Sequence, residues 1–291
     1  MKGFETEAPF PDYERVLDEI AETGYAGTEL GDWGFMPTDP DVLKPELERR
    51  GLDMVGALVP LALADHSRHG EYVETALRTA RLLAACAHEE PGIEPFVILA
   101  DENGADHIRT QFAGRIQPEH GLSNDAWRVF TDGADMVARR VLDETGLRTA
   151  FHHHCAGFVE TSGETIRLLE MTDPSLVGLC FDTGHWAYAG GDPVGALRLL
   201  GERVWHVHFK DCYPEIAEQA SREKWDYFRA VRNGVFYGLG GGEVGFDALL
   251  VMLRERDYGG WIVVEDELPP GMGEPLESAQ KDRAYLKGLG I

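Results

Sequence analysis

The chain has 291 residues, with 51 acidic side chains against 27 basic ones, so its formal net charge is −24. A surface of this sign repels phosphates, which argues against nucleic acid and an anionic membrane leaflet as partners. No apolar run approaches the roughly 18 residues that cross a bilayer, and the polar start Met1–Ala8 lacks the basic and apolar regions of a signal peptide. We therefore expect a cytoplasmic protein with no membrane partner.

The predicted elements alternate between helical periodicity and short apolar runs. In chain order they begin with helix Tyr13–Thr23, strand Gly27–Leu30, helix Val42–Arg50, strand Asp53–Val59, helix Glu71–Ala87, strand Pro95–Ala100 and helix Ser123–Glu144. They continue with strand Arg148–His154, helix Gly163–Met171, strand Leu176–Asp182, helix Pro193–Leu200, strand Val204–Lys210, helix Phe246–Arg256, strand Gly260–Glu265 and helix Pro275–Leu286.

Strands that are apolar throughout, such as Phe96–Leu99 and Trp261–Val264, are typical of a parallel sheet covered on both faces. Eight strand–helix units in roughly 250 residues form a closed barrel, whereas an open doubly wound sheet usually carries a glycine-rich first turn. We predict a single (β/α)8 TIM barrel over residues 1–291, with an open sheet as the alternative. Because the first clear element is a helix, we expect the first strand to be short, truncated or limited to Lys2–Thr6.

Two long segments, 101–122 and 211–243, follow predicted strands and should lie over the carboxyl-terminal mouth, where barrels build active sites. The second contains a helical piece, Glu215–Asn233, which we interpret as a lid or as a contact in a homo-oligomer.

Polar side chains gather at the ends of consecutive strands, where charge is otherwise costly. They are Glu29, His152, His154, Asp182, His185, His206, His208 and Glu265. Alternation along a strand turns His152 with His154, and His206 with His208, toward one space. Carboxylates and imidazoles without a thiolate favour Mn²⁺ or Co²⁺, and also suit Mg²⁺, Fe²⁺ or Zn²⁺.

The remaining histidines and the cysteines are expected to be structural. His66, His69, His88, His107 and His120 are scattered over helices and loops, and His153 should point between strand and helix. The cysteines Cys86, Cys155, Cys180 and Cys212 form neither a CxxC pair nor a disulfide framework, so we expect reduced, buried thiols.

Several segments resemble a known family. Phe181–His185, His206–Asp211 and Ile262–Glu265 look like the metal-ligand strands of the xylose isomerase-like TIM barrels, the sugar phosphate isomerase/epimerase superfamily. Within it the keto-inositol dehydratases are the most similar, on Thr28–Gly31, Phe151–His154, Val159–Thr161, Asp182–His185, Gly190–Pro193 and Ala230–Phe236.

The resemblance implies a divalent metal held by four strands, and three ligands carry over, namely Asp182, His208 and Glu265. Where many members have a glutamate on the fifth strand, this chain has His152, so the fourth ligand is either His152 or a loop carboxylate, Glu160. We favour Glu160, because two neutral imidazoles leave less negative charge around the cation.

The function implied is dehydration of a keto-inositol through a metal-stabilised enediolate. Glu265 or His152 would take the proton, His185 or Lys210 would protonate the leaving hydroxyl, and His154 would serve turnover rather than metal binding. The alternatives are a metal-dependent ketose isomerase or epimerase, and a sugar-binding barrel that has lost its chemistry.

Glu29 and Trp33 are expected to line the pocket for a small carbohydrate, the ring offering an apolar face. Lys210 has a competing structural role as the ion-pair partner of Asp211. The block Gly238–Glu243 resembles a phosphate cradle and is equally suited to a hinge; the acidic chain favours a neutral substrate.

Overall fold

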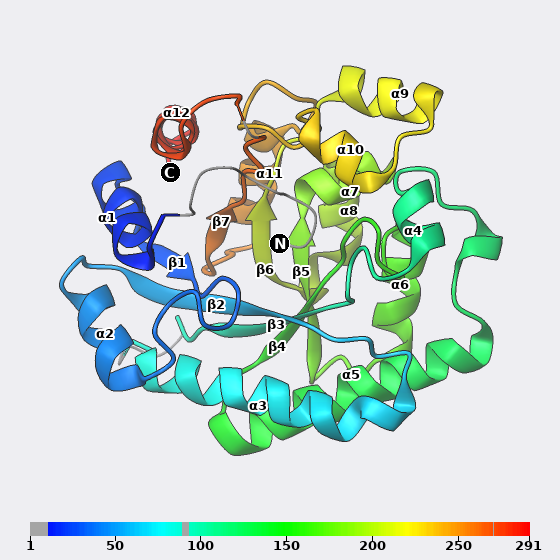
Figure 1. Cartoon of the computed structure of the whole chain (residues 1–291), viewed down its shortest axis with the longest axis horizontal. Coiled ribbons are helices and arrows are strands. Elements are labelled where there is room, and N and C mark those ends of the chain that lie inside the picture. The colour runs from blue at the N-terminus through cyan, green and yellow to red at the C-terminus, as the bar shows by residue number, and fades with distance from the viewer. Residues whose placement is uncertain (1–10, 89–92, 270) are drawn as a thin grey trace.

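The computed structural model describes residues 11–88, 93–269 and 271–291. Its parallel strands run around a nearly closed barrel in chain order, each paired with the next (Figure 1). They are β1 (Gly27–Glu29), β2 (Asp53–Pro60), β3 (Phe96–Ala100), β4 (Thr149–His152), β5 (Val177–Asp182), β6 (Val204–Phe209) and β7 (Ile262–Val264). The prediction of a TIM barrel is confirmed.

Helices cover the outside of the barrel and its mouth. They are α1 (Tyr13–Thr23), α2 (Pro40–Glu48), α3 (His69–Cys86), α4 (His107–Phe112), α5 (Asn124–Thr145), α6 (Ser162–Met171), α7 (Thr183–Tyr188), α8 (Pro193–Leu200), α9 (Pro214–Glu223), α10 (Tyr227–Arg232), α11 (Phe246–Glu255) and α12 (Pro275–Gly288). Single 3-10 turns occur at His66–Arg68, Pro118–His120 and Gly201–Arg203.

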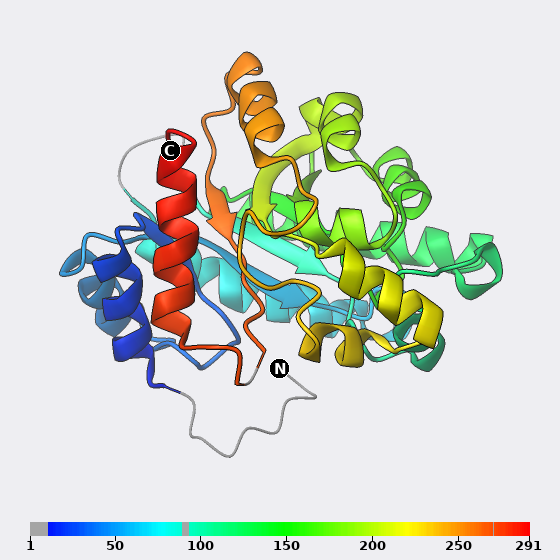
Figure 2. The same cartoon turned by 90° about the horizontal axis from the view of Figure 1, so that it is seen from above.

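The first and last helices lie side by side. β1 and β7 are the two ends of the strand order, and α1 packs beside α12 in both views (Figures 1 and 2). The strand predicted at Lys2–Thr6 lies outside the described residues.

Capping residues explain the best-predicted boundaries. The Asp12 side chain accepts a hydrogen bond from the Arg15 N–H, and Gly24 ends α1 in the left-handed region at φ 89°. Two expectations were wrong. The first long segment contains α4, and the helical piece expected at Glu215–Asn233 is two helices, separated by a left-handed Lys224 at φ 56°.

β3, β4 and β5 are buried along their whole length, as the apolar run Phe96–Leu99 predicts, whereas β7, expected to be equally buried, is only half-buried. Parallel register sets Asp182 of β5 opposite His208 of β6, and His152 of β4 opposite Cys180 of β5. The carboxyl ends of β4 to β7 therefore meet at one end of the barrel.

Candidate metal centre and active site

Four side chains from four adjacent strand ends meet inside the mouth of the barrel. His152, Asp182, His208 and Glu265 each offer a ligand atom, and these atoms lie within 4.8 Å of one another. The imidazoles and Asp182 are buried, whereas the Glu265 side chain is 35 % exposed. The cluster is therefore shielded from solvent by the barrel except on the Glu265 side.

Asp182 is held from two directions so that one oxygen faces the cluster. Its Oδ1 accepts the His185 backbone N–H at 2.8 Å, capping α7, and its own N–H donates to His153 Nε2 at 3.2 Å. Its Oδ2 is buried without a hydrogen bond and lies 3.5 Å from His152 Nε2. His153 thus lies outside the barrel, as expected, and orients a candidate ligand.

His208 lies between two carboxylates. Its Nδ1 is 2.7 Å from Glu265 Oε2, and its Nε2 is 2.9 Å from Glu29 Oε1. The same Glu29 oxygen is 2.8 Å from His206 Nε2. Burial alone would raise the pKa of Glu29, but the two imidazoles outweigh it and hold that pKa far below its usual value.

Lys210 is fully buried and bridges two carboxylates. Its Nζ lies 3.1 Å from Glu265 Oε1 and 2.8 Å from Glu267 Oε1. Burial acts to lower the pKa of Lys210, yet Glu265 and Glu267 together raise it well above the usual value. The expected pairing with Asp211 is wrong, because Lys210 reaches into the site while Asp211 turns to another loop.

A second group lies beside the first. His154, His185 and Glu267 also offer ligand atoms within 4.8 Å of one another. The rings of His154 and His185 are 3.8 Å apart between centroids, and Tyr227 of α10 packs against both. The segment 211–243 therefore contributes a wall to this part of the site.

His154 has a defined proton position. Its Nδ1 lies 2.6 Å from the carbonyl oxygen of Cys155, which can only accept, so Nδ1 carries the hydrogen. Burial lowers the pKa of His154 to about 4, which keeps the ring neutral. Its Nε2 is therefore an acceptor, with Asn103 Nδ2 at 3.5 Å. Both nitrogens of His185 are buried without partners.

Glu160 is not brought into the cluster. Its Oε1 accepts the Gly114 N–H at 2.7 Å and its Oε2 accepts the Ala156 N–H at 2.8 Å, so both oxygens are committed to backbone. None of the ligand groups found in the described part of the chain includes Glu160. The structure thus places the alternative, His152, beside the other three residues. Burial raises the pKa of Glu160 to about 7.

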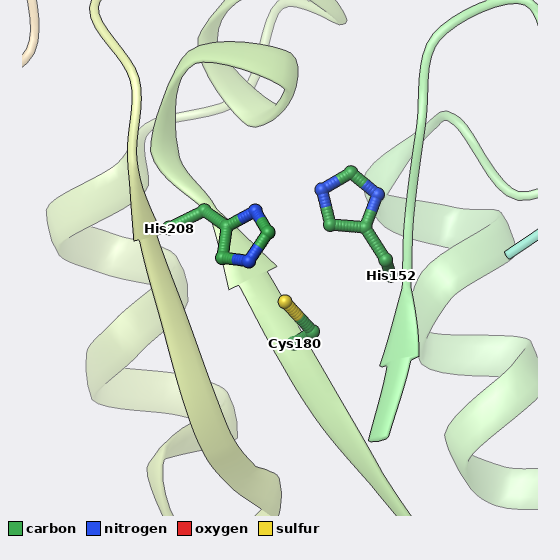
Figure 3. Close-up of side chains that lie close together, drawn as sticks. All are labelled: His152, Cys180 and His208. Carbon is green, nitrogen blue, oxygen red and sulfur yellow. The ribbon is translucent and has the colours of Figure 1, made fainter. Parts of the chain in front are cut away.

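Cys180 is a neighbour of the site that the sequence analysis missed. Figure 3 shows its thiol between the rings of His152 and His208, all three reaching into the same space. Cys180 precedes Asp182 by two positions on β5, so strand alternation could have placed both on one face. The same argument applies to Glu267, which follows Glu265 by two positions.

The glycine-rich loop is occupied by the chain itself. Asp211 Oδ2 accepts the N–H groups of Gly240 and Gly242 at 2.8 and 2.9 Å, and Oδ1 accepts those of Cys212 and Val244 at 2.8 and 3.1 Å. A Cβ at Gly242 would stand 2.3 Å from Asp211 Oδ1. The phosphate-cradle interpretation is wrong, because the Asp211 carboxylate already accepts the hydrogen bonds of these amide groups.

Trp33 lies in the loop after β1, where its ring is 38 % exposed and carries the Arg78 guanidinium at 4.2 Å. Its contact with substrate stays a prediction. His69 is a buried structural residue, as expected, with Nε2 2.8 Å from the Leu63 carbonyl oxygen. The four thiols are free and buried.

The four-residue cluster fits a divalent cation. Asp182 Oδ2 and both nitrogens of His152 are buried and lack hydrogen-bond partners, which is costly unless a ligand supplies them. Two imidazoles with two carboxylates are a donor set suited to first-row divalent ions.

This fold and this cluster define the class of protein. The family model of the xylose isomerase-like TIM barrel matches residues 17–289. The chain belongs to this family.

Particular relatives narrow the comparison. A curated inosose dehydratase of Geobacillus kaustophilus (strain HTA426) is 33 % identical over 276 residues, which are 95 % of this chain and 87 % of the relative. An inosose dehydratase of Clostridium beijerinckii (strain ATCC 51743 / NCIMB 8052) is 32 % identical over 279 residues, covering 94 % and 89 %. Among solved structures, the IolI protein with a bound zinc atom has a TM-score of 0.70 at 15 % identity, covering 96 % of this chain and 93 % of its own.

No helix in the described ranges is long and apolar enough to span a membrane.

Proposed function

We propose that this chain is a divalent-metal-dependent lyase that dehydrates a keto-inositol. The observation that carries the proposal is the cluster of His152, Asp182, His208 and Glu265 at four adjacent strand ends. Relatives named inosose dehydratase, 33 % identical over most of both chains, supply the substrate class.

The proposed metal ligands are those four residues, with Glu160 no longer among them. A divalent cation bound there would polarise the substrate carbonyl and so acidify the neighbouring C–H bond. Lys210 would fix the outer oxygen of Glu265, leaving Oε2 directed at His208.

Proton transfer falls to the second group. The sequence suggested Glu265 or His152 as the base, but both lie in the proposed ligand set. The His154 Nε2 lone pair is the better-placed acceptor for the proton on the carbon next to the carbonyl. Burial lowers the pKa of His185 and keeps its ring neutral, so the proton taken by His154 would reach the departing hydroxyl by way of the neighbouring His185 ring. Lys210 is less suited to this role, because its ammonium is paired with two carboxylates. The products are water and an enol that tautomerises to the dione.

A neutral carbohydrate is the proposed substrate rather than a sugar phosphate. The amides of Gly240 and Gly242, which could bind a phosphate, are occupied by Asp211. The acidic chain further disfavours a phosphorylated ligand.

We further propose that Mn²⁺ or Co²⁺ is the native metal and that the protein works in the cytoplasm in inositol catabolism. The segment 211–243 would serve as a lid over the site, since Tyr227 contacts the rings of His154 and His185. A homo-oligomer contact by the same segment is the alternative.

The direct test is to incubate the metal-loaded protein with scyllo-inosose and to follow dione formation in the ultraviolet. We expect dione to form. His154→Gln should abolish turnover while metal content stays at one ion per chain, whereas His107→Gln, on the exposed start of α4, should behave like the parent.

Two outcomes would contradict the proposal. Interconversion of a ketose pair without dione would indicate an isomerase or epimerase. Absence of bound divalent metal, together with full stability after chelation, would indicate the non-catalytic barrel.

A further inference from the structure

Glu29 has an unusual position for a pocket-lining residue. It lies at the end of β1, yet its carboxylate crosses the barrel to β6. Its Oε1 is 2.8 Å from His206 Nε2 and 2.9 Å from His208 Nε2, and its side chain is 18 % exposed. Its carboxylate is therefore directed at two imidazoles on one strand.

These contacts place a hydrogen on Nε2 of each ring. Because a carboxylate oxygen accepts, His206 and His208 both carry hydrogen on Nε2 when they donate to Glu29. Glu265 Oε2 accepts from Nδ1 of His208 in the same way, so Nδ1 gives up its hydrogen only where a cation takes that hydrogen's place. The nitrogen of His208 that faces Glu265, at 2.7 Å, and Asp182, at 4.0 Å, is then Nδ1.

We propose that Glu29 is the positioning residue of the metal centre: it holds Nε2–H of His208, so that Nδ1 is presented to the cation with its lone pair. A carboxylate on the far nitrogen of a metal-binding imidazole fixes its orientation and raises its basicity. This inference rests on the proposed metal site and goes beyond it, since Glu29 is not one of the four ligands.

Glu29 also adds to the negative charge near the proposed cation. His152 stands where many family members have a glutamate, so this ligand set has one negative charge fewer than theirs. Glu29 supplies a carboxylate one hydrogen bond from His208. The charge enters through the imidazole rather than by direct ligation.

The test is the affinity for Co²⁺ and Zn²⁺, measured by competition with a chromophoric chelator at one pH. Glu29→Gln should bind each ion about 10- to 100-fold more weakly than the parent. The matched control is Asp101→Asn, a buried carboxyl that follows β3 and accepts the Phe158 N–H. It should leave the affinity unchanged.

His206→Phe separates metal positioning from general bracing. It removes the other imidazole from Glu29 while leaving His208 and all four ligands in place, so affinity should stay at the parent value. If this variant loses as much metal affinity as Glu29→Gln, Glu29 has only a structural role in the barrel, and the inference is overturned.

A second readout follows the proton itself. In the Zn²⁺-loaded protein with ¹⁵N-labelled histidine, downfield Nε2–H signals are expected from His206 and His208, and also from His69, whose Nε2 donates to the Leu63 carbonyl oxygen. His206→Phe removes and thereby assigns the His206 signal. The His208 signal should move upfield in Glu29→Gln, whereas the His69 signal should stay in place. An unmoved His208 signal with unchanged affinity would refute the inference.

Failure of the proposed metal site gives a different result from failure of this inference: the parent protein itself would then bind neither Co²⁺ nor Zn²⁺. Where Glu29→Gln does not fold by circular dichroism, Glu29→Asp decides. It keeps the charge but shortens the reach, so weaker binding by a folded protein supports the inference and parent-like binding overturns it.

Discussion

Glu160 should govern part of the pH dependence of stability. Burial raises its pKa from 4.5 to about 7 in the folded chain. A group whose folded pKa is raised contributes its stabilisation fully below the unfolded pKa. That stabilisation is lost as the pH rises through the folded pKa. The loss attributable to Glu160 therefore falls between about pH 4.5 and pH 7.

The magnitude follows from the two pKa values. A difference of roughly 2.5 units corresponds to about 3.4 kcal/mol in full, of which about 2.5 kcal/mol falls between pH 5 and pH 8. The backbone N–H groups of Ala156 and Gly114 favour the ionised carboxyl, so burial has to exceed their effect.

Glu160→Gln removes this titration. The amide loses one of the two acceptor oxygens, so the variant should be less stable than the parent at low pH. Between pH 5 and pH 8, however, its free energy of unfolding should fall by about 2.5 kcal/mol less than that of the parent. Urea unfolding, followed by circular dichroism with a chelator present, measures both quantities. Glu119→Gln, at an exposed carboxyl, should keep the parent's pH dependence.

Equal pH dependence in Glu160→Gln and the parent would refute the reasoning from burial. The metal affinity of Glu160→Gln tests whether Glu160 is a metal ligand. This affinity should match that of the parent, because both Glu160 oxygens accept hydrogen bonds from backbone N–H groups. A large loss of metal by Glu160→Gln, with metal kept by His152→Ala, would restore Glu160 as the fourth ligand.

Three further predictions concern other parts of the molecule. Asp182→Ala should abolish metal retention, measured by elemental analysis after dialysis, whereas His154→Gln should not. Asp211→Asn should cost about 2–4 kcal/mol, because the new amide opposes two loop N–H groups. It should also open the Gly238–Gly242 loop to proteolysis, and an uncut loop would contradict the role of Asp211. Arg109→Met should cost about 3–5 kcal/mol in urea unfolding, since it removes the buried guanidinium that pairs with the largely buried Glu164 carboxylate at 2.8 Å.

The boundaries that sequence predicts well are those with a local signal. Helices Tyr13–Thr23 and Pro193–Leu200 begin and end where expected, because Asp12 and Asp192 cap them and Gly24 or Gly201 follows. The six residues of α4 are too few to show helical periodicity and were missed. The break at Lys224 has no local signal either, because a lysine does not favour the left-handed backbone that it adopts there.

Site residues on strands could be predicted, because the alternation of side chains along one strand is a short-range property. Asp182, His208 and His152 follow from their strands, and the same rule would have found Cys180. Glu160 could not be placed in this way. Its oxygens are satisfied partly by Gly114, 46 positions away, and no local pattern encodes where such a loop closes.

The acidic composition acquires a structural meaning at the barrel mouth. Glu29, Asp182, Glu265 and Glu267 lie there, and the buried ammonium of Lys210 pairs with Glu265 and Glu267. Buried charges of one sign are tolerated only when they are paired or bind a cation. The imidazoles of His152 and His208 add ligand atoms without adding negative charge, and Lys210 pairs with only two of the four carboxylates. A divalent cation is the smallest addition that offsets most of this charge, because it supplies two positive charges at the point where Asp182 Oδ2 lacks a partner.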